Sequence, residues 1–131
     1  GDIRRDFPGG WPKDTQNAFS ENGRVSKQAK YYDFSKKLIQ WRKTNAAIHF
    51  GKTLHYVPRD DVYVYFRYTD DERVMIIVNN NTLDQKISLN RYSEGIAGRT
   101  QAFEIISEAT FQLPKVLKIP AATTLIVELS L

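Results

Sequence analysis

The first eleven residues combine side chains that bind polar ligands in many proteins. Arg4, Arg5, Asp6, Phe7 and Trp11 stand on either side of a Pro-Gly-Gly turn, without a helical or strand period. Arginine and aspartate hydrogen-bond to hydroxyl groups, and an indole ring stacks on flat apolar faces. A purely local arrangement also fits, in which Arg5 pairs with Asp6 and Trp11 packs on a neighbouring surface. A binding role and a structural role therefore both stay open.

Other candidate groups for chemistry are sparse. The acidic runs Asp60-Asp61 and Asp70-Asp71-Glu72 fall at predicted strand ends, where adjacent carboxylates usually form solvated turns rather than an acid and base facing each other across a pocket. His49 and His55 are the only histidines, their spacing is not that of metal ligands, and cysteine is absent. We therefore predict no metal site and no cofactor. Gly-x-Ser-x-Gly and Walker-type motifs are also missing.

The excess of positive over negative charge lies at one end of the chain. The formal net charge is +4; residues 1–50 hold ten Lys and Arg against five Asp and Glu, and residues 51–131 hold nine against ten. The strand-like part therefore lacks the interleaved basic and aromatic residues of a nucleic-acid surface. The longest apolar run, residues 74–78, is too short to span a membrane. We expect neither a nucleic-acid nor a membrane partner.

One long helix is predicted, followed only by strands. Tyr31, Phe34, Leu38 and Trp41 recur at spacings of three and four, which predicts a helix from Lys27 to Thr44 with Ser26 as its N-cap. Lysines fill the other positions. An aromatic stripe of this kind needs a partner surface, because exposed apolar patches drive association.

After Gly51 the hydrophobic period changes to two. Alternation predicts strands at residues 62–68, 74–78, 87–89, 103–106, 110–113, 116–119 and 125–131, with a loop from Glu94 to Gly98. The second of these is apolar on both faces and is expected to be central. Closely spaced strands without helices between them favour an antiparallel sandwich or barrel.

Three stretches resemble the C-terminal end of α-amylase family glycoside hydrolases, nearest to the cyclomaltodextrinase and neopullulanase branch. They are RRDFPGGW (residues 4–11), LIQWRKTNAAIHFGKTLHY (38–56) and VMIIVNNN (74–81). The first resembles the loop after the eighth barrel strand, the second the last barrel helix running into the next domain, and the third an early strand of the C-terminal sandwich. The resemblance implies a mainly β fold: a Greek-key-type antiparallel β-sandwich preceded by a long loop and one α-helix.

The same resemblance implies a division of the chain and a role. Residues 1–50 would be the end of a (β/α)8 barrel, and residues 51–131 the C-terminal β-sandwich domain. The family cleaves α-1,4-glucosidic bonds of starch-derived glucans or cyclomaltodextrins with two aspartates and a glutamate. Their motifs are absent here, so we expect the catalytic carboxylates to lie upstream, no catalytic residue to be present, and the chain alone to be inactive. Its role would be to stabilise the barrel, and Arg4, Arg5, Asp6, Phe7 and Trp11 would contribute to outer subsites for oligosaccharides in the intact enzyme.

An alternative function is glucan binding by the β part itself. Tyr63 and Tyr65 alternate with the core-facing residues of their strand and so share its outer face, where they would form a platform for sugar rings. A third expectation concerns the helix: separated from its barrel partner, the chain would self-associate through the aromatic face. Enzymes of this branch occur in the periplasm and in the cytoplasm, so the resemblance leaves the compartment unknown.

Overall fold

The computed structural model describes residues 6–131, which belong to two compact units, residues 1–39 and 40–131. Helix α1 (Ser26–Thr44) begins in the first unit and ends in the second. The predicted helix is confirmed, although it begins at Ser26 itself. The backbone N–H of Val25 donates to Gln28 Oε1, so Gln28 rather than Ser26 satisfies the amide that precedes the helix.

The first unit consists of turns, a 3-10 turn η1 (Glu21–Gly23) and the first half of α1. Arg24 organises it: its Nε donates to Ala18 O at 2.8 Å, its Nη2 donates to Phe19 O at 3.1 Å, and its guanidinium lies 3.5 Å from the ring centre of Tyr32. Ala18 is the one buried hydrophobic residue among residues 6–39. This unit is therefore held together by polar contacts to the backbone and has almost no core of its own.

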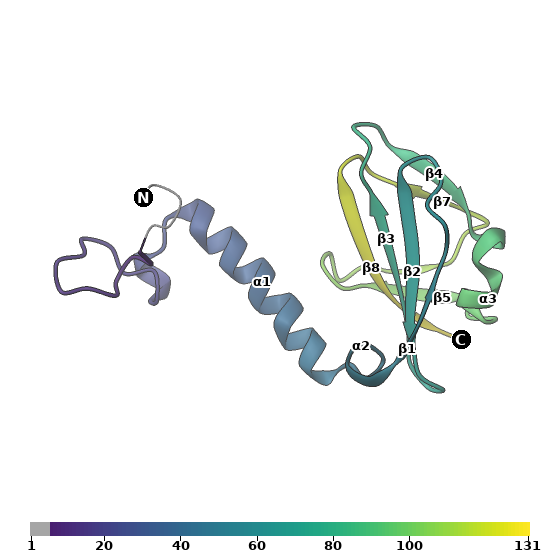
Figure 1. The fold of residues 1–131 in the computed structure, drawn as a ribbon, viewed down its shortest axis with the longest axis horizontal. Coiled ribbons are helices and arrows are strands. Elements are labelled where there is room, and N and C mark those ends of the chain that lie inside the picture. The colour runs from purple at the N-terminus through teal and green to yellow at the C-terminus, as the bar shows by residue number, and fades with distance from the viewer. Residues whose placement is uncertain (1–5) are drawn as a thin grey trace. The chain divides into compact units, whose positions relative to one another are not determined.

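The second unit is an antiparallel β-sandwich (Figure 1). Its large sheet has the order β1-β2-β3-β8-β5-β6, and β4 pairs with β7 in a second sheet. The connections are of Greek-key type, because β8 lies between β3 and β5 and the second sheet joins two strands distant in sequence. The strands are β1 (Lys52–His55), β2 (Val62–Tyr68), β3 (Arg73–Asn79), β4 (Gln85–Ser88), β5 (Gln101–Glu104), β6 (Thr110–Gln112), β7 (Val116–Ile119) and β8 (Thr123–Ser130).

The main core lies between the two sheets. The inner faces of β2, β3 and β8 contribute alternate residues, and β4 and β7 close the core from the other side. Because side chains alternate along a strand, Val64 and Phe66 point inward while Tyr63 and Tyr65 point outward. The fully buried members include Val64, Phe66, Met75, Ile77, Ile119 and Val127.

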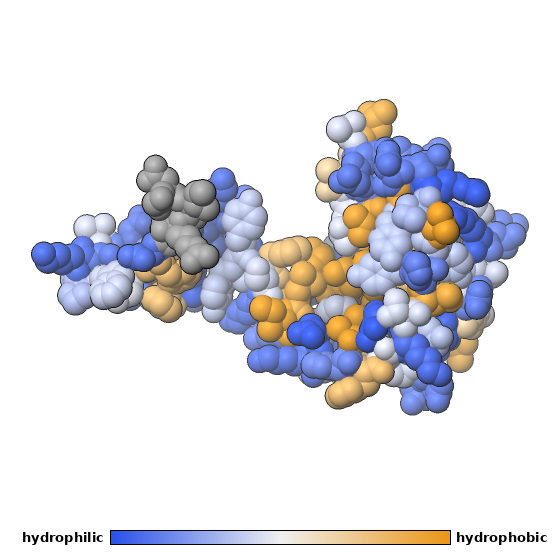
Figure 2. Space-filling model, viewed as in Figure 1, coloured by the Kyte–Doolittle hydropathy of each residue, from blue (hydrophilic) through white to orange (hydrophobic). Residues whose placement is uncertain are grey.

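The outer face of the large sheet, opposite β4 and β7, carries a second apolar cluster. Val74 and Ile76 on β3 pack there against Ala47 of the short helix α2 (Ala46–Phe50) and against Trp41. Strand β3 is therefore buried on both faces and pairs with β2 and β8, as its two-sided apolar pattern predicted. Figure 2 shows further hydrophobic residues at the surface of this unit, including the region of α2.

Several local predictions were wrong. Helix α2 and strand β1 were not predicted, because each has only five or four residues and too few apolar positions to show a period. Leu89 belongs to a 3-10 turn, η2 (Leu89–Tyr92), instead of a strand. The predicted loop at Glu94–Gly98 contains the one-turn helix α3 (Ser93–Ile96), which ends at Ala97 with φ +50°. Gly95 lies so close to Phe66 that a Cβ there would meet the ring.

Candidate functional site

The predicted N-terminal binding residues are only partly described. Arg4 and Arg5 lie outside the described residues. Asp6, Phe7 and Trp11 are exposed, with Trp11 at 64% of its surface and the Phe7 ring 4.7 Å from the ring of Phe19. No contact therefore joins Asp6, Phe7 and Trp11 into one site within residues 6–39, and their proposed role at outer subsites stays a prediction.

Asp14 shapes the loop that presents Trp11. Its Oδ2 accepts hydrogen bonds from the backbone N–H groups of Gly9, at 2.7 Å, and Trp11, at 3.1 Å. Gly9 has φ +101°, a conformation that side chains with a Cβ rarely adopt, and a Cβ there would also collide with Asn17. Sequence reasoning missed Asp14, although an aspartate a few residues after Gly-Gly is a recognisable turn signal.

Tyr63 and Tyr65 share the outer face of β2, as predicted. Their rings stack with centres 5.3 Å apart, and His55 of the neighbouring strand approaches Tyr63 edge-on at 6.5 Å. Both tyrosines are half-buried, and burial, followed by the nearby Tyr63, raises the pKa of Tyr65. Since the rings face each other, one face of each is occupied and only the remaining surface is open to another molecule.

A polar site lies where α1 ends on the sheet. Glu128 of β8 accepts two hydrogen bonds at Oε1, from Trp41 Nε1 at 2.6 Å and from Asn45 Nδ2 at 3.0 Å. Asn45 in turn caps α2, because its Oδ1 accepts from Ile48 N at 3.0 Å. One carboxylate thus connects the last turn of α1, the residue between the two helices and the centre of the sheet.

Helix α2 is held at both ends by two charged side chains, Arg67 of β2 and Glu72 of the turn between β2 and β3. Glu72 Oε2 accepts from Ala47 N at 2.9 Å, whereas Arg67 donates from Nε to Ala47 O and from Nη2 to Ile48 O, at 3.2 and 3.1 Å. An anion at the amide end and a cation at the carbonyl end of a helix are both stabilising. The expectation that Asp70-Asp71-Glu72 is merely a solvated turn is therefore wrong for Glu72. We call the set Trp41, Asn45, Arg67, Glu72 and Glu128 the helix–sheet joint.

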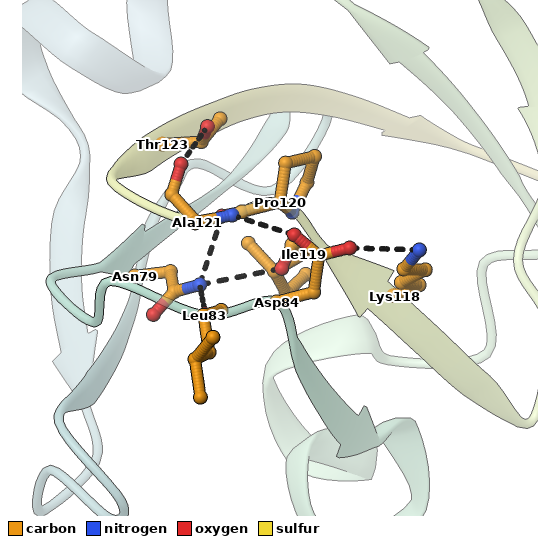
Figure 3. Close-up of polar contacts among 8 residues, drawn as sticks. All are labelled: Asn79, Leu83, Asp84, Lys118, Ile119, Pro120, Ala121 and Thr123. Atoms are coloured by element: carbon orange, nitrogen blue, oxygen red, sulfur yellow. Dashed lines mark hydrogen bonds and ion pairs between the residues drawn. The ribbon is translucent and has the colours of Figure 1, made fainter.

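A second polar network fixes the two sheets to each other (Figure 3). The side chain of Asn79, only 1% exposed at the end of β3, donates from Nδ2 to Leu83 O, Ile119 O and Pro120 O, at 3.2, 3.3 and 2.8 Å. Asp84 accepts from Ala121 N at 3.0 Å and pairs with Lys118 at 2.8 Å, contacts that lower the pKa of its carboxyl group. The Asn-rich end of β3 therefore has a structural role.

Candidate metal ligands are dispersed within residues 6–131. That range contains no group of three or more His, Cys, Asp or Glu side chains placed to hold a metal ion. His49 and His55 are both exposed. No helix in the same range has the length and apolar character needed to cross a membrane.

A family comparison decides what this sandwich is. The family model of the cyclo-malto-dextrinase C-terminal domain matches residues 53–128, more than half of the chain and all but the ends of the strand-rich part. The chain belongs to this family. The resemblance to the C-terminal end of α-amylase family enzymes is thereby confirmed, and the family's name agrees with the cyclomaltodextrinase side of the predicted branch.

Solved structures agree with this C-terminal domain assignment at the level of the fold. The α-amylase from Geobacillus thermoleovorans, complexed with acarbose, has a TM-score of 0.67 and 17% identity over 81% of this chain. AmyP in complex with maltose has a TM-score of 0.68 and 15% identity over 79%. The trehalulose synthase MutB from Pseudomonas mesoacidophila MX-45 has a TM-score of 0.61 and 23% identity over 76%.

The chain corresponds to only a small part of each of these three proteins. The chain spans 24%, 21% and 18% of the length of the three proteins, in the same order. The match to the Geobacillus enzyme covers more of this chain than residues 40–131 make up alone, so it extends into the first unit.

Proposed function

We propose that this chain is the non-catalytic C-terminal part of an α-amylase family enzyme that hydrolyses α-1,4-glucosidic bonds in starch-derived glucans or cyclomaltodextrins. In this proposal residues 1–50 complete the catalytic barrel and residues 51–131 form the C-terminal domain. The catalytic barrel of the same polypeptide is then the partner, oligosaccharides are the substrate, and the role of the sandwich is to stabilise the barrel.

The helix–sheet joint is the observation that carries the proposal. A domain that stabilises its neighbour must hold the connecting element firmly, and here Trp41 and Asn45 donate to Glu128 while Glu72 and Arg67 fix the two ends of α2. The preceding helix has no buried residue, and Tyr31 and Phe34 are 65% and 48% exposed. Such a face is typical of a helix that packs against another part of a larger protein.

The role of the helix–sheet joint can be tested in the full enzyme of which this chain is proposed to be a part. Two changes are useful, a truncation and a single substitution. A stop codon after residue 50 removes the sandwich, and Glu128→Ala leaves the Trp41 and Asn45 donors without their acceptor. Each buried donor left unpaired costs about 1–3 kcal/mol. We expect the truncation to abolish soluble enzyme and Glu128→Ala to lower the unfolding temperature without changing KM for maltoheptaose.

Glu128→Gln is the control, because its amide oxygen can still accept from Trp41 and Asn45. It should retain most of the stability. A truncated enzyme that stays soluble and as heat-resistant as the full-length protein would contradict the stabilising role.

The second candidate function is glucan binding by the sandwich. The stacked pair Tyr63 and Tyr65, with His55 beside it, favours this function because aromatic groups on one exposed face can contact sugar rings. Retardation of the chain in a native gel containing soluble starch, lost in Tyr63→Ala, would support it. Equal mobility with and without starch would contradict glucan binding by the sandwich.

A further inference from the structure

The outer face of the large sheet, opposite β4 and β7, is only partly covered within residues 40–131. Helix α2 and Trp41 pack over Val74 and Ile76, which are buried. Residues directly opposite each other in an antiparallel pair share one face, so the register of β1, β2, β3 and β8 shows which side chains continue this face. We call the half-buried and exposed ones the outer sheet face: His55, Tyr63, Tyr65, Val78, Thr124 and Ile126.

The outer sheet face has the composition of a buried surface. It contains no Lys, Arg, Asp or Glu, although these residues make up 26% of the chain. An antiparallel sheet with one face in water normally alternates apolar and polar residues, whereas β3 is apolar on both faces. Tyr65, Val78 and Ile126 also pack against the buried cluster under α2. We therefore expect a further layer of protein over this face.

The outward surface of the second sheet has a different composition. Lys86 of β4 and Lys118 of β7 are register partners there, and Ser88 pairs with Val116. All four side chains are exposed. Charged and polar residues are the usual components of a sheet surface in water. One outward surface of the sandwich therefore suits water, and the outer sheet face suits another protein surface.

The last turn of α1 indicates which protein surface this is. Trp41 packs against the same cluster as Val78 and Ile126, and its indole N–H donates to Glu128 of β8. The outer sheet face is thus continuous with the helix–sheet joint, where α1 enters the sheet unit. In the three structural relatives, the part that corresponds to this chain is 24%, 21% and 18% of the protein, so the remainder of such a protein is large enough to supply the layer.

We propose that the outer sheet face docks on the catalytic barrel of the same polypeptide. The inference rests on the proposed function, which supplies the barrel, and it adds the surface through which the sandwich holds that barrel. Burial of the aliphatic side chains and of the two tyrosine rings provides the hydrophobic free energy of docking. The stacked pair Tyr63 and Tyr65 then contacts barrel side chains and is closed to sugar rings.

The test compares how fast iodoacetamide labels introduced thiols in the 131-residue chain and in the full enzyme. Thr124→Cys places a thiol on the outer sheet face, and Ser88→Cys is the matched control on the outward surface of the second sheet; both are exposed strand positions. The chain has no cysteine, so each thiol is unique within it, and mass spectrometry of the labelled peptide identifies it in the full enzyme.

A thiol inside an interface reacts only when the interface opens. We therefore expect Thr124→Cys to be labelled at least about tenfold more slowly in the full enzyme than in the chain. Ser88→Cys should be labelled at the same rate in both.

Three kinds of result would overturn the proposal. Equal labelling of Thr124→Cys in both proteins, or equal slowing of Ser88→Cys, would show that the barrel does not cover this face in particular. Slow labelling of Thr124→Cys already in the chain would assign the face to a second copy if it depends on chain concentration, and to the chain itself if it does not. Slowing of this labelling in the chain by maltoheptaose would assign the face to a glucan. Release of reducing sugar by the full enzyme tests the proposed function separately, so failure of docking in an active enzyme is distinguishable from failure of that function.

Discussion

Residues 40–131 and residues 6–39 differ in what holds them together. The sheet unit has an apolar core between its sheets and a second apolar cluster on the outer face of β3, whereas the helix unit buries one alanine and is ordered by Arg24, Asp14 and the backbone. Hydrophobic burial is the main favourable term in folding. The sheet unit therefore has the apolar core needed to fold by itself, whereas the helix unit needs a surface provided by another part of a protein.

The largest expected effect comes from separating the two regions. We expect a 40–131 protein to keep its sheet and unfold cooperatively, and a 1–39 peptide to be largely unstructured, because isolated helices shorter than about 12–15 residues are marginal in water. Circular dichroism of both would test this. A 1–39 peptide that is helical and melts cooperatively would contradict this expectation.

A pair of phenylalanine truncations gives the next largest effect. Phe66 is 0% exposed in the main core and Phe34 is 48% exposed on α1. Phe66→Ala should lower the free energy of unfolding by about 3–5 kcal/mol. Phe34→Ala should stay within about 0.5 kcal/mol of the unsubstituted chain. Urea unfolding measures both, and similar losses would mean that the helix face is already packed.

Glu104 provides a smaller, pH-dependent effect within the sheet unit. Burial acts to raise the pKa of this carboxyl group, but hydrogen bonds from Ser107, Ile106 and Ile126 outweigh it, and the pKa is lowered. Ionised Glu104 therefore stabilises the folded chain above the unfolded-state pKa of about 4.3, and this contribution is lost as the pH falls through the lower folded-state pKa.

The corresponding variant is Glu104→Gln. We expect it to be less stable than the unsubstituted chain by about 1–3 kcal/mol at pH 7, and the difference to shrink as the pH is lowered below about 4. Thermal unfolding across this pH range is the measurement. A difference in stability that does not depend on pH would show that the negative charge of Glu104 does not stabilise the folded chain.

Much of the sheet unit follows from its sequence. The period of two in residues 62–68 predicted which side chains of β2 face the core, and the apolar faces of residues 74–78 predicted that β3 is central. The pairing of β4 with β7 is not visible in the sequence, because both strands have four residues and their contact joins segments about thirty positions apart.

The helix–sheet joint was largely beyond prediction for a related reason. Trp41 belongs to the aromatic stripe of α1, which was expected to pack on a barrel; instead its indole N–H donates to Glu128, 87 positions away. The sequence predicts that Glu72 belongs to a solvated acidic turn. In the structure, α2 lies beside this turn and Ala47 N donates to Glu72. Long-range partners of single polar side chains leave no periodic signal in a sequence.

The measurement that most directly tests the central proposal is the release of reducing sugar from maltoheptaose and β-cyclodextrin by the purified 131-residue chain. The proposal places the catalytic carboxylates outside this chain and predicts no release above a buffer control, whether or not either sugar binds. Reproducible release that scales with the amount of folded chain, and that heat unfolding abolishes, would contradict it.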